Sequence, residues 1–173
     1  MNAMLKIVKT FSDVDLDRLL FLYQTDIIKF GEEHFYKLSS FEMKRAAEES
    51  FIAYLREDFF LQENAFCALW IVQGEYKAAL RIQPYRDDGV LLDALITAPE
   101  GRRKGYAFKL VSAVQEYLSA YPYVIMYSHI DKKNLPSIEL HKKCGFQLCS
   151  DSARYLDGTV THNSCTMNYL LKK

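Results

Sequence analysis

A basic loop that contains a glycine joins an apolar run to a helical pattern in the second half of the sequence. Residues 90–97 form a short apolar run bounded by turn residues, which indicates a buried strand. Apolar residues then recur with helical spacing from residue 107 to residue 118, so a helix begins inside the loop. A helix start presents unpaired N–H groups and a partial positive charge, and both favour a phosphate. Arg102, Arg103 and Lys104 add formal charge and Gly105 allows a ligand to approach closely, so we predict a pyrophosphate-binding loop.

Two other phosphate-binding motifs do not match this loop. A Walker A loop ends in Gly-Lys-Ser/Thr, whereas the order here is Lys104-Gly105-Tyr106. The dinucleotide fingerprint needs three spaced glycines, and this stretch offers Gly101 and Gly105. The loop therefore belongs to another class of phosphate site.

The chain has 173 residues, half of them hydrophobic and 25% charged, which predicts one globular domain over residues 1–173. Its formal net charge is zero, so no overall field attracts nucleic acid or a membrane, and an anion site must be local. No early apolar stretch has the length of a signal peptide or membrane span. The four cysteines lack CxxC pairs and zinc-ligand spacing, so we expect reduced thiols and no metal site. These features predict a cytoplasmic protein without nucleic acid or membrane partners, and they leave monomer and homodimer open.

Hydrophobic periodicity predicts alternating helices and strands. A helix with an apolar stripe over residues 16–27 follows a capping pattern at Ser12 and Asp15, and Gly31 is its expected end. A second helix begins at Ser39, with Glu42 three residues later. The predicted strands span residues 4–8, 65–72, 76–82, 90–97, 123–130 and 161–170, and another begins over 146–149.

The connections between these elements indicate an α/β fold. Tight turns at 73–75 and 86–89 join three strands into an antiparallel meander. A strand, a helix and a strand over 90–130 imply a right-handed parallel crossover. A last helix is expected between a cap at Asn134 and a stop at Gly145, and residues 151–158 are expected to form a loop. The predicted fold is a mixed, mostly antiparallel sheet flanked by helices.

Two motifs resemble the GNAT family of acyl-CoA-dependent N-acetyltransferases. The acyl-CoA loop of that family reads Gln/Arg-x-x-Gly-x-Gly/Ala, and Arg102, Gly105 and Ala107 occupy its three defined positions. The family commonly has an Asn further on, a small residue three positions later, and then Leu-Tyr-x-Lys-x-Gly-Phe. Asn134, Ser137 and residues 140–146, Leu-His-Lys-Lys-Cys-Gly-Phe, stand in the same register. The resemblance implies a single-domain GNAT-like fold, with a close match from about residue 65 onwards and a match in topology before it.

By this resemblance, acetyl-CoA is the expected cosubstrate, in a cleft between the strand that ends at residue 97 and the strand 123–130. The backbone of residues 95–97 would hydrogen-bond the pantetheine arm as an added strand would. Amides of residues 103–107 would hold the pyrophosphate, and Asn134 would contact the cofactor near its arm. The predicted cofactor-binding residues are Leu95, Ile96, Thr97, Arg102, Arg103, Lys104, Gly105, Tyr106, Ala107 and Asn134.

The family resemblance also points to two catalytic residues, Asp93 and His141. A lysine-like amine has a pKa near ~10.4 and must lose a proton before it attacks. Asp93 matches the strand position where many family members place a carboxylate that takes this proton; a strand carboxylate that faces solvent or fixes a turn is the alternative. His141 stands where family members often have a tyrosine that protonates the leaving sulfur. A histidine can supply a hydrogen bond or a proton there, and a helix-end histidine without a catalytic part is the alternative.

These features together predict an acyltransferase that moves an acetyl group from acetyl-CoA to a primary amine of a small molecule or a protein. A non-catalytic acyl-CoA-binding or regulatory module on the same fold is the alternative, because a histidine replaces the usual tyrosine at residue 141. The early helices carry no charge theme that names the acceptor.

Overall fold

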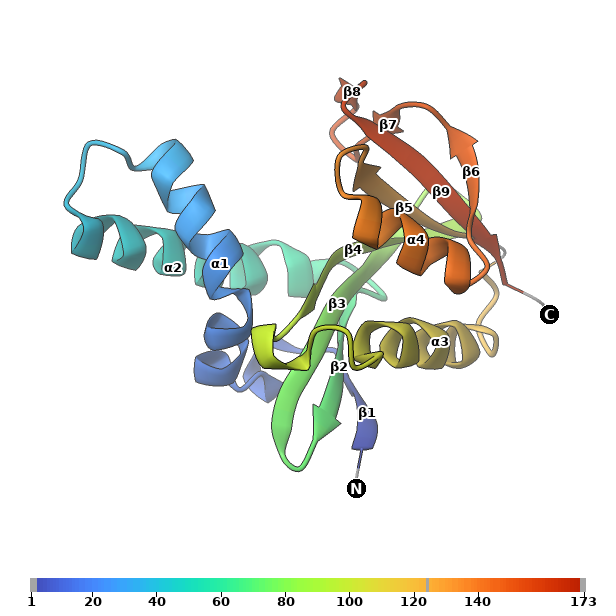
Figure 1. Cartoon of the computed structure of the whole chain (residues 1–173), viewed down its shortest axis with the longest axis horizontal. Coiled ribbons are helices and arrows are strands. Elements are labelled where there is room, and N and C mark those ends of the chain that lie inside the picture. Colours follow the sequence, from blue (N-terminus) through green and yellow to red (C-terminus); the bar gives the residue numbers. More distant parts are fainter. Residues whose placement is uncertain (1–2, 124, 172–173) are drawn as a thin grey trace.

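A seven-stranded sheet forms the centre of the computed structural model, which describes residues 3–123 and 125–171. The strand order is β1-β2-β3-β4-β5-β9-β6, and the pairing is antiparallel except between β4 and β5. A short two-stranded ribbon of β7 and β8 lies close to the start of β9 (Figure 1). The predicted mixed, mostly antiparallel α/β fold is confirmed. The strands are β1 (Ala3–Val8), β2 (Phe66–Val72), β3 (Glu75–Tyr85), β4 (Gly89–Thr97), β5 (Ile125–Asp131), β6 (Gln147–Ser150), β7 (Ala153–Arg154), β8 (Val160–Thr161) and β9 (Ser164–Leu170).

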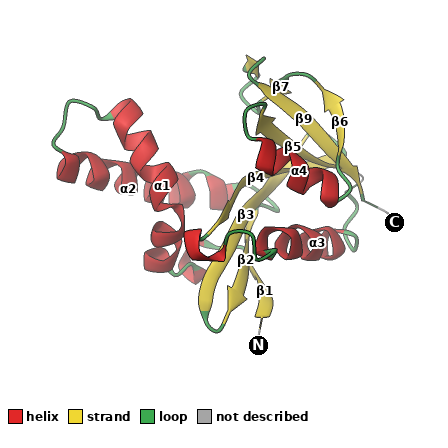
Figure 2. Ribbon diagram, in the orientation of Figure 1, coloured by secondary structure: helices red, strands yellow, loops and turns green. Residues whose placement is uncertain are grey.

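Helices flank the sheet on both faces, as Figure 2 shows. One core cluster joins α1 and α2 to the sheet through buried residues such as Leu19, Leu55 and Leu69. The other cluster joins α3 to the opposite face through residues such as Leu110 and Leu80. Each helix buries an apolar stripe of the spacing that the sequence shows. In the described part of the chain, the α-helices are α1 (Leu16–His34), α2 (Ser40–Glu57), α3 (Tyr106–Leu118) and α4 (Leu135–Lys143).

The predicted crossover is β4, α3 and β5. Its helix begins at Tyr106, inside the basic loop, and ends at Leu118 as expected. The strand predicted over 123–130 is β5, which begins at Ile125; Val124 lies outside the described residues. Helix α3 lies between β4 and β5 in the chain and packs on β2, β3 and β4. The loop before α3 therefore begins where β4 ends.

The expected end of the first helix at Gly31 is wrong, because α1 continues to His34. A Cβ atom at Gly31 would stand 3.0 Å from the Met43 Cγ and 3.3 Å from the Ala47 Cβ. The glycine therefore allows α1 and α2 to approach each other closely instead of ending the helix.

The caps of α1 and α2 differ in how well the sequence predicts them. Asp15 caps α1 by accepting the Arg18 amide at 3.2 Å, so Ser12 is not the cap; it lies in a short 3-10 turn before the helix. Ser39 and Glu42 form the predicted capping box, with the Ser39 amide 3.2 Å from the Glu42 Oε2. A local polar pattern thus fixes the start of α2.

Helix α4 has the expected cap and stop. The Asn134 Oδ1 accepts the Ser137 amide at 3.2 Å, and Gly145 adopts φ of +85° after the last turn. The Phe146 amide then bonds back to the His141 carbonyl at 3.0 Å, as in a Schellman motif. Two later expectations need correction: the loop over 151–158 contains β7, and the last strand is interrupted, because β8 ends at residue 161 and β9 starts at residue 164.

Loss of the capping box should destabilise the fold. We expect Ser39→Ala to lower the free energy of unfolding by about 1 kcal/mol, because the Glu42 amide loses its acceptor. Ser40→Ala, inside the first turn and outside the box, is the control and should change it by less than about 0.5 kcal/mol. Urea denaturation followed by circular dichroism measures both, and equal losses would contradict the assigned cap.

Candidate active site

Strands β4 and β5 part in the middle of the sheet and leave a cleft. Their pairing covers Gly89–Leu92 against Ile125–Ser128 and stops there, whereas β4 continues to Thr97 and β5 to Asp131. Beyond Leu92, the edge of β4 that faces β5 has no strand partner within the described chain. A cavity of about 170 Å³ lies in this opening, and its walls include Asp93, Leu95, Asn134 and His141.

A β-bulge in β4 marks the point where the strands part. The register shifts between Ala79 and Arg81 of β3, so one residue there faces two residues of β4. Ala94 in this bulge has φ of +51°, which is unusual for a residue with a Cβ. Its carbonyl accepts a 2.6 Å hydrogen bond from the buried Tyr23 hydroxyl of α1. Helix α1 therefore holds the bulge from the opposite side of the sheet to α3.

The loop before α3 presents free backbone amides. Gly105 caps the helix with φ of +77°, and the Lys109 amide bonds back to the Gly105 carbonyl at 3.0 Å. Among the described residues, the amides at 103 and at 105–108 have no hydrogen-bond partner. A Cβ atom at Gly105 would meet nothing within 4 Å, so the space above these amides is open. The donors, the space and the helix dipole fit a pyrophosphate.

The basic side chains of this loop are exposed, whereas its tyrosine packs against the loop. Arg102, Arg103 and Lys104 are exposed, and none of them forms an ion pair with another described residue. Tyr106 packs against Gly101, where a Cβ atom would stand 2.9 Å from its ring. The ring of Tyr106 therefore supports the loop, and its free amide is the group available to a ligand.

Asp93 stands at the wall of the cleft and pairs with Arg81. The Arg81 Nη2 lies 3.2 Å from the Asp93 Oδ2. The Asp93 side chain is 45% exposed and the Arg81 side chain is 13% exposed. The Arg81 guanidinium lies 5.0 Å from the Tyr54 ring centroid and 5.7 Å from that of Phe59. Packed aromatic rings thus fix the arginine, and the arginine positions the carboxylate.

A second cavity, of about 630 Å³, meets the cleft at Asp93. Leu92, Asp93 and His129 line both cavities. The other walls come from the end of α2, with Tyr54 and Asp58, and from the segment after β7. Sequence reasoning missed this cavity because no local pattern joins residues 54–62 to residues 155–157, and the early helices carry no charge theme that would have pointed to it.

His129 is the wall residue between the two cavities that the sequence did not single out. Its Nε2 lies 3.0 Å from the Arg154 carbonyl, to which it donates, and its Nδ1 lies 3.0 Å from the Thr166 Oγ1. Burial lowers the pKa of this imidazole. The Thr166 hydroxyl gives its hydrogen to the Ser152 carbonyl, so the Nε2–H bond to the Arg154 carbonyl is the one that joins β5 to β7 and orients the ring.

His141 is buried, with 2% of its surface exposed. Its Nδ1 donates to the Ser137 carbonyl at 2.8 Å, and its Nε2 is buried without a partner among the described residues. Burial lowers the pKa of His141, so the neutral ring is favoured. A neutral ring with its hydrogen on Nδ1 carries a lone pair, and no proton, at Nε2.

Asn134 lies at the start of α4, where the cleft ends. Its Oδ1 is used in the helix cap, and its amide nitrogen has no partner within the described chain. The fold therefore brings Asp93, Leu95, Asn134 and His141 to one cavity. Ile96 and Thr97 do not line it; they end β4, and the basic loop follows them. No group of three metal-ligating side chains occurs in the part of the chain that the structure describes.

Comparisons with known proteins identify the class of protein that this fold and site define. The model of the acetyltransferase (GNAT) family matches residues 32–146. An N-acetyltransferase from Staphylococcus aureus Mu50 has a TM-score of 0.65 at 18% identity, with 99% of this chain and 100% of that chain covered. A ribosomal-protein-S18-alanine N-acetyltransferase from Escherichia coli has a TM-score of 0.62 at 16% identity, with 98% and 96% covered. An aminoglycoside acetyltransferase, AAC(6')-Ib, in complex with coenzyme A has a TM-score of 0.66 at 17% identity, with 98% and 95% covered.

The family model spans more than half of the chain, so the chain belongs to the GNAT acetyltransferase family. It is an acetyltransferase, and acetyl-CoA is the cosubstrate that this family assignment gives it. The search of curated proteins found no match. No helix among the described residues is both long enough and apolar enough to cross a membrane.

The buried His141 should make stability depend on pH. Its pKa is lowered in the folded chain, so below about pH 6.5 the unfolded chain binds a proton that the folded chain does not. The free energy of unfolding therefore falls as pH falls. We expect His141→Asn, which keeps a donor near the Ser137 carbonyl, to lose less stability than wild type between about pH 7.5 and about pH 5.5 in urea denaturation. His129 contributes the same trend to both proteins, and equal losses would contradict a buried neutral His141.

Proposed function

We propose that this chain transfers the acetyl group of acetyl-CoA to a primary amine. The observation that carries the proposal is the position of Asp93, which lines both the cleft between β4 and β5 and the larger cavity beside it. A carboxylate at this junction has access to a thioester from one side and an amine from the other. The residues that line the two cavities support a thioester in the cleft and an amine in the larger cavity.

The cleft offers backbone and side-chain groups for a CoA arm. The unpaired edge of β4 at residues 95–97 would receive the amide groups of the arm as a further strand would, and Asn134 has a free amide nitrogen at the far wall. The amides at 103 and at 105–107 would hold the pyrophosphate beside Arg102, Arg103 and Lys104, whereas the Lys104 amide is used within the loop by the Gly101 carbonyl. When bound, acetyl-CoA supplies the activated acyl group as a thioester.

The larger cavity suits a cationic acceptor. Three carboxylates, Asp58, Asp93 and Asp157, line it together with the rings of Tyr54 and Tyr155. Asp58 and Asp157 form no ion pair with any other described residue. A protonated amine is attracted to such a cavity by charge and by the aromatic faces. These features favour an amine over a neutral alcohol as the acceptor.

Asp93 is the proposed general base. A protonated amine with a pKa near ~10.4 must lose a proton before it attacks the thioester carbonyl. Arg81 holds the carboxylate at the junction, and nearly half of the carboxylate side chain is open to the cavities, with 45% exposed. A backbone amide near Leu95 in the unpaired part of β4 would stabilise the developing oxyanion.

His141 has a more limited role in this proposal. It would protonate the departing sulfur only as imidazolium, and its burial disfavours that form. A thiolate has a pKa near ~8.5 and leaves with little help. We therefore assign His141 a role in shaping the cleft wall. It lies in the last turn of α4, and its Nδ1 donates to the Ser137 carbonyl one turn earlier.

Removal of the Asp93 carboxylate should slow acetyl transfer. In a thiol-release assay with acetyl-CoA and a panel of amines, we expect Asp93→Asn to lower kcat by about 10²-fold to 10⁴-fold, the usual contribution of a general base. The loss should shrink as the pH approaches the pKa of the amine, because free amine then needs no base.

Asp151→Asn is the matched control, because Asp151 is 86% exposed and lines neither cavity. Its kcat should equal that of wild type. Unchanged turnover in Asp93→Asn would remove Asp93 from the mechanism. Silence of the wild-type protein across a broad amine panel, with acetyl-CoA binding intact, would favour a non-catalytic acyl-CoA-binding module.

A charged side chain at Gly105 should weaken cofactor binding. We expect Gly105→Glu to weaken acetyl-CoA binding at least about tenfold in titration calorimetry, and to reduce the ligand-induced rise in Tm, because a carboxylate would fill the open space above the amides. Gly74→Glu is the control: Gly74 has φ of +80° and equally open space, but it lies in the turn between β2 and β3. Normal affinity in Gly105→Glu would show that the loop does not hold the pyrophosphate.

A further inference from the structure

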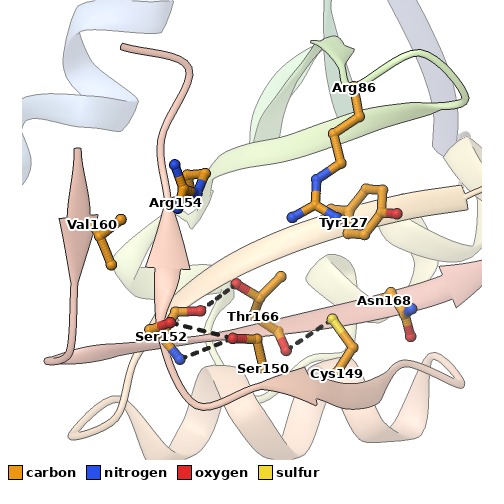
Figure 3. Close-up of a pocket in the computed structure, with 9 residues that line it drawn as sticks. All are labelled: Arg86, Tyr127, Cys149, Ser150, Ser152, Arg154, Val160, Thr166 and Asn168. Carbon is orange, nitrogen blue, oxygen red and sulfur yellow. Dashed lines mark hydrogen bonds between the residues drawn. The ribbon is translucent and has the colours of Figure 1, made fainter. Parts of the chain in front are cut away.

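A third hollow, of about 270 Å³, lies beyond β7 from the acceptor cavity. Figure 3 shows it between Arg86 and Arg154 on one side and Ser150, Ser152 and Thr166 on the other. It shares no lining residue with either cavity of the proposed active site.

Two guanidinium groups face this hollow without a carboxylate partner. The Arg86 guanidinium lies 5.2 Å from the Tyr85 ring centroid and 5.0 Å from that of Tyr127, so two aromatic rings orient it. The Arg154 main chain is fixed, because its carbonyl accepts the Tyr85 hydroxyl at 2.7 Å. Neither arginine forms an ion pair with any residue in the described chain. Aromatic rings orient the Arg86 guanidinium and hydrogen bonds fix the Arg154 main chain, and no described carboxylate neutralises either charge.

The opposite wall supplies hydroxyl groups in a fixed arrangement. The Ser152 amide donates to the Ser150 Oγ at 3.2 Å, and the two serine hydroxyl oxygens stand 3.3 Å apart. Thr166 donates to the Ser152 carbonyl at 2.7 Å and so anchors the segment to β9. One of the two serine hydroxyls donates to the other, so the hydrogen of the accepting hydroxyl is available to a ligand.

We propose that this hollow binds a small phosphoryl oxyanion. Two arginines and serine hydroxyls line the hollow and match the oxygen atoms of a phosphate, and the lining contains no carboxylate that would repel it. The volume of about 270 Å³ lies below the range for drug-sized ligands, so the site takes a phosphoryl group with little attached to it.

The site and the acceptor cavity share one structural element. Arg154 of β7 lines the phosphoryl site, and the next residue, Tyr155, lines the acceptor cavity. The His129 ring contacts this segment through the Arg154 carbonyl. The bound group is therefore either a free phosphate ion beside the acceptor or the phosphoryl end of the acceptor itself, and the chemistry of recognition is the same.

Titration calorimetry with inorganic phosphate tests the proposal, with saturating CoA and no amine present, so that the proposed pyrophosphate loop before α3 is occupied. We expect saturable binding by wild type and a loss of about tenfold in affinity in Arg154→Gln and in Arg86→Gln, because each removes a charge-assisted donor. Arg45→Gln is the matched control, since Arg45 is exposed on α2 and paired with Glu49, and its affinity should equal that of wild type.

Gly105→Glu, titrated without CoA, separates this site from the loop before α3: the phosphate binding that it retains should be lost when Arg154→Gln is added. Binding that is lost in Gly105→Glu and kept in Arg154→Gln would overturn the proposal, as would the absence of saturable binding. Arg154 has an exposed side chain with no packing role, so Arg154→Gln should fold normally, with Tm as the check.

Kinetics with an accepted amine then identify the source of the phosphoryl group. Phosphate that competes with the amine, with the competition lost in Arg154→Gln, supports a phosphoryl group on the acceptor. Phosphate that changes kcat without competing supports a separate ion. The proposal stands independently of the acetyl-transfer mechanism, because the binding measurement needs no turnover.

Discussion

The separation of β4 and β5 is the constraint on which the rest of the site depends. A continuous parallel pair would consume the backbone groups of both strands, and the pairing here ends at Leu92 and Ser128. The bulge at Ala94 bends β4 away, and the Tyr23 hydroxyl stabilises the bulge carbonyl. The resulting cleft exposes one strand edge for a cofactor and leads, along β4, to the amides at the start of α3. A single irregularity in the sheet therefore links the acyl end and the phosphate end of the proposed cofactor site.

Charge is separated within a chain whose formal net charge is zero. The basic loop at 102–104 follows the cleft, whereas the carboxylates of Asp58, Asp93 and Asp157 line the proposed acceptor cavity. This arrangement would draw an anionic cofactor and a cationic acceptor to different entrances. Overall composition conceals it, because opposite charges cancel in the sum and act only over short distances in salt.

Buried polar groups are used here to position other groups. Arg81 is held among aromatic rings and places the Asp93 carboxylate at the junction of the two cavities. His141 directs one nitrogen to the Ser137 carbonyl and keeps its neutral form through burial. His129 joins β5 to the segment at β7. Each of these side chains orients a wall of the site.

The sequence by itself determined the elements whose signals are local. Periodicity located the strands and the two long helices, the Ser39–Glu42 pair predicted the capping box, and the motifs at 102–107 and 134–146 predicted the family and the cofactor loop. These features depend on residues within a few positions of one another. Local signals failed where packing decides: Gly31 was taken as a helix end, although it allows α1 and α2 to approach.

Only the tertiary structure decided which distant residues share a cavity. It joined Asp58 and Asp157 to Asp93, placed His129 between the two cavities, and set Arg86 opposite Ser150 and Ser152. It also gave His141 its protonation preference, since desolvation depends on what surrounds a ring and not on its neighbours in sequence. Spacing along the chain carries no information on such contacts, because strand order and helix packing create them.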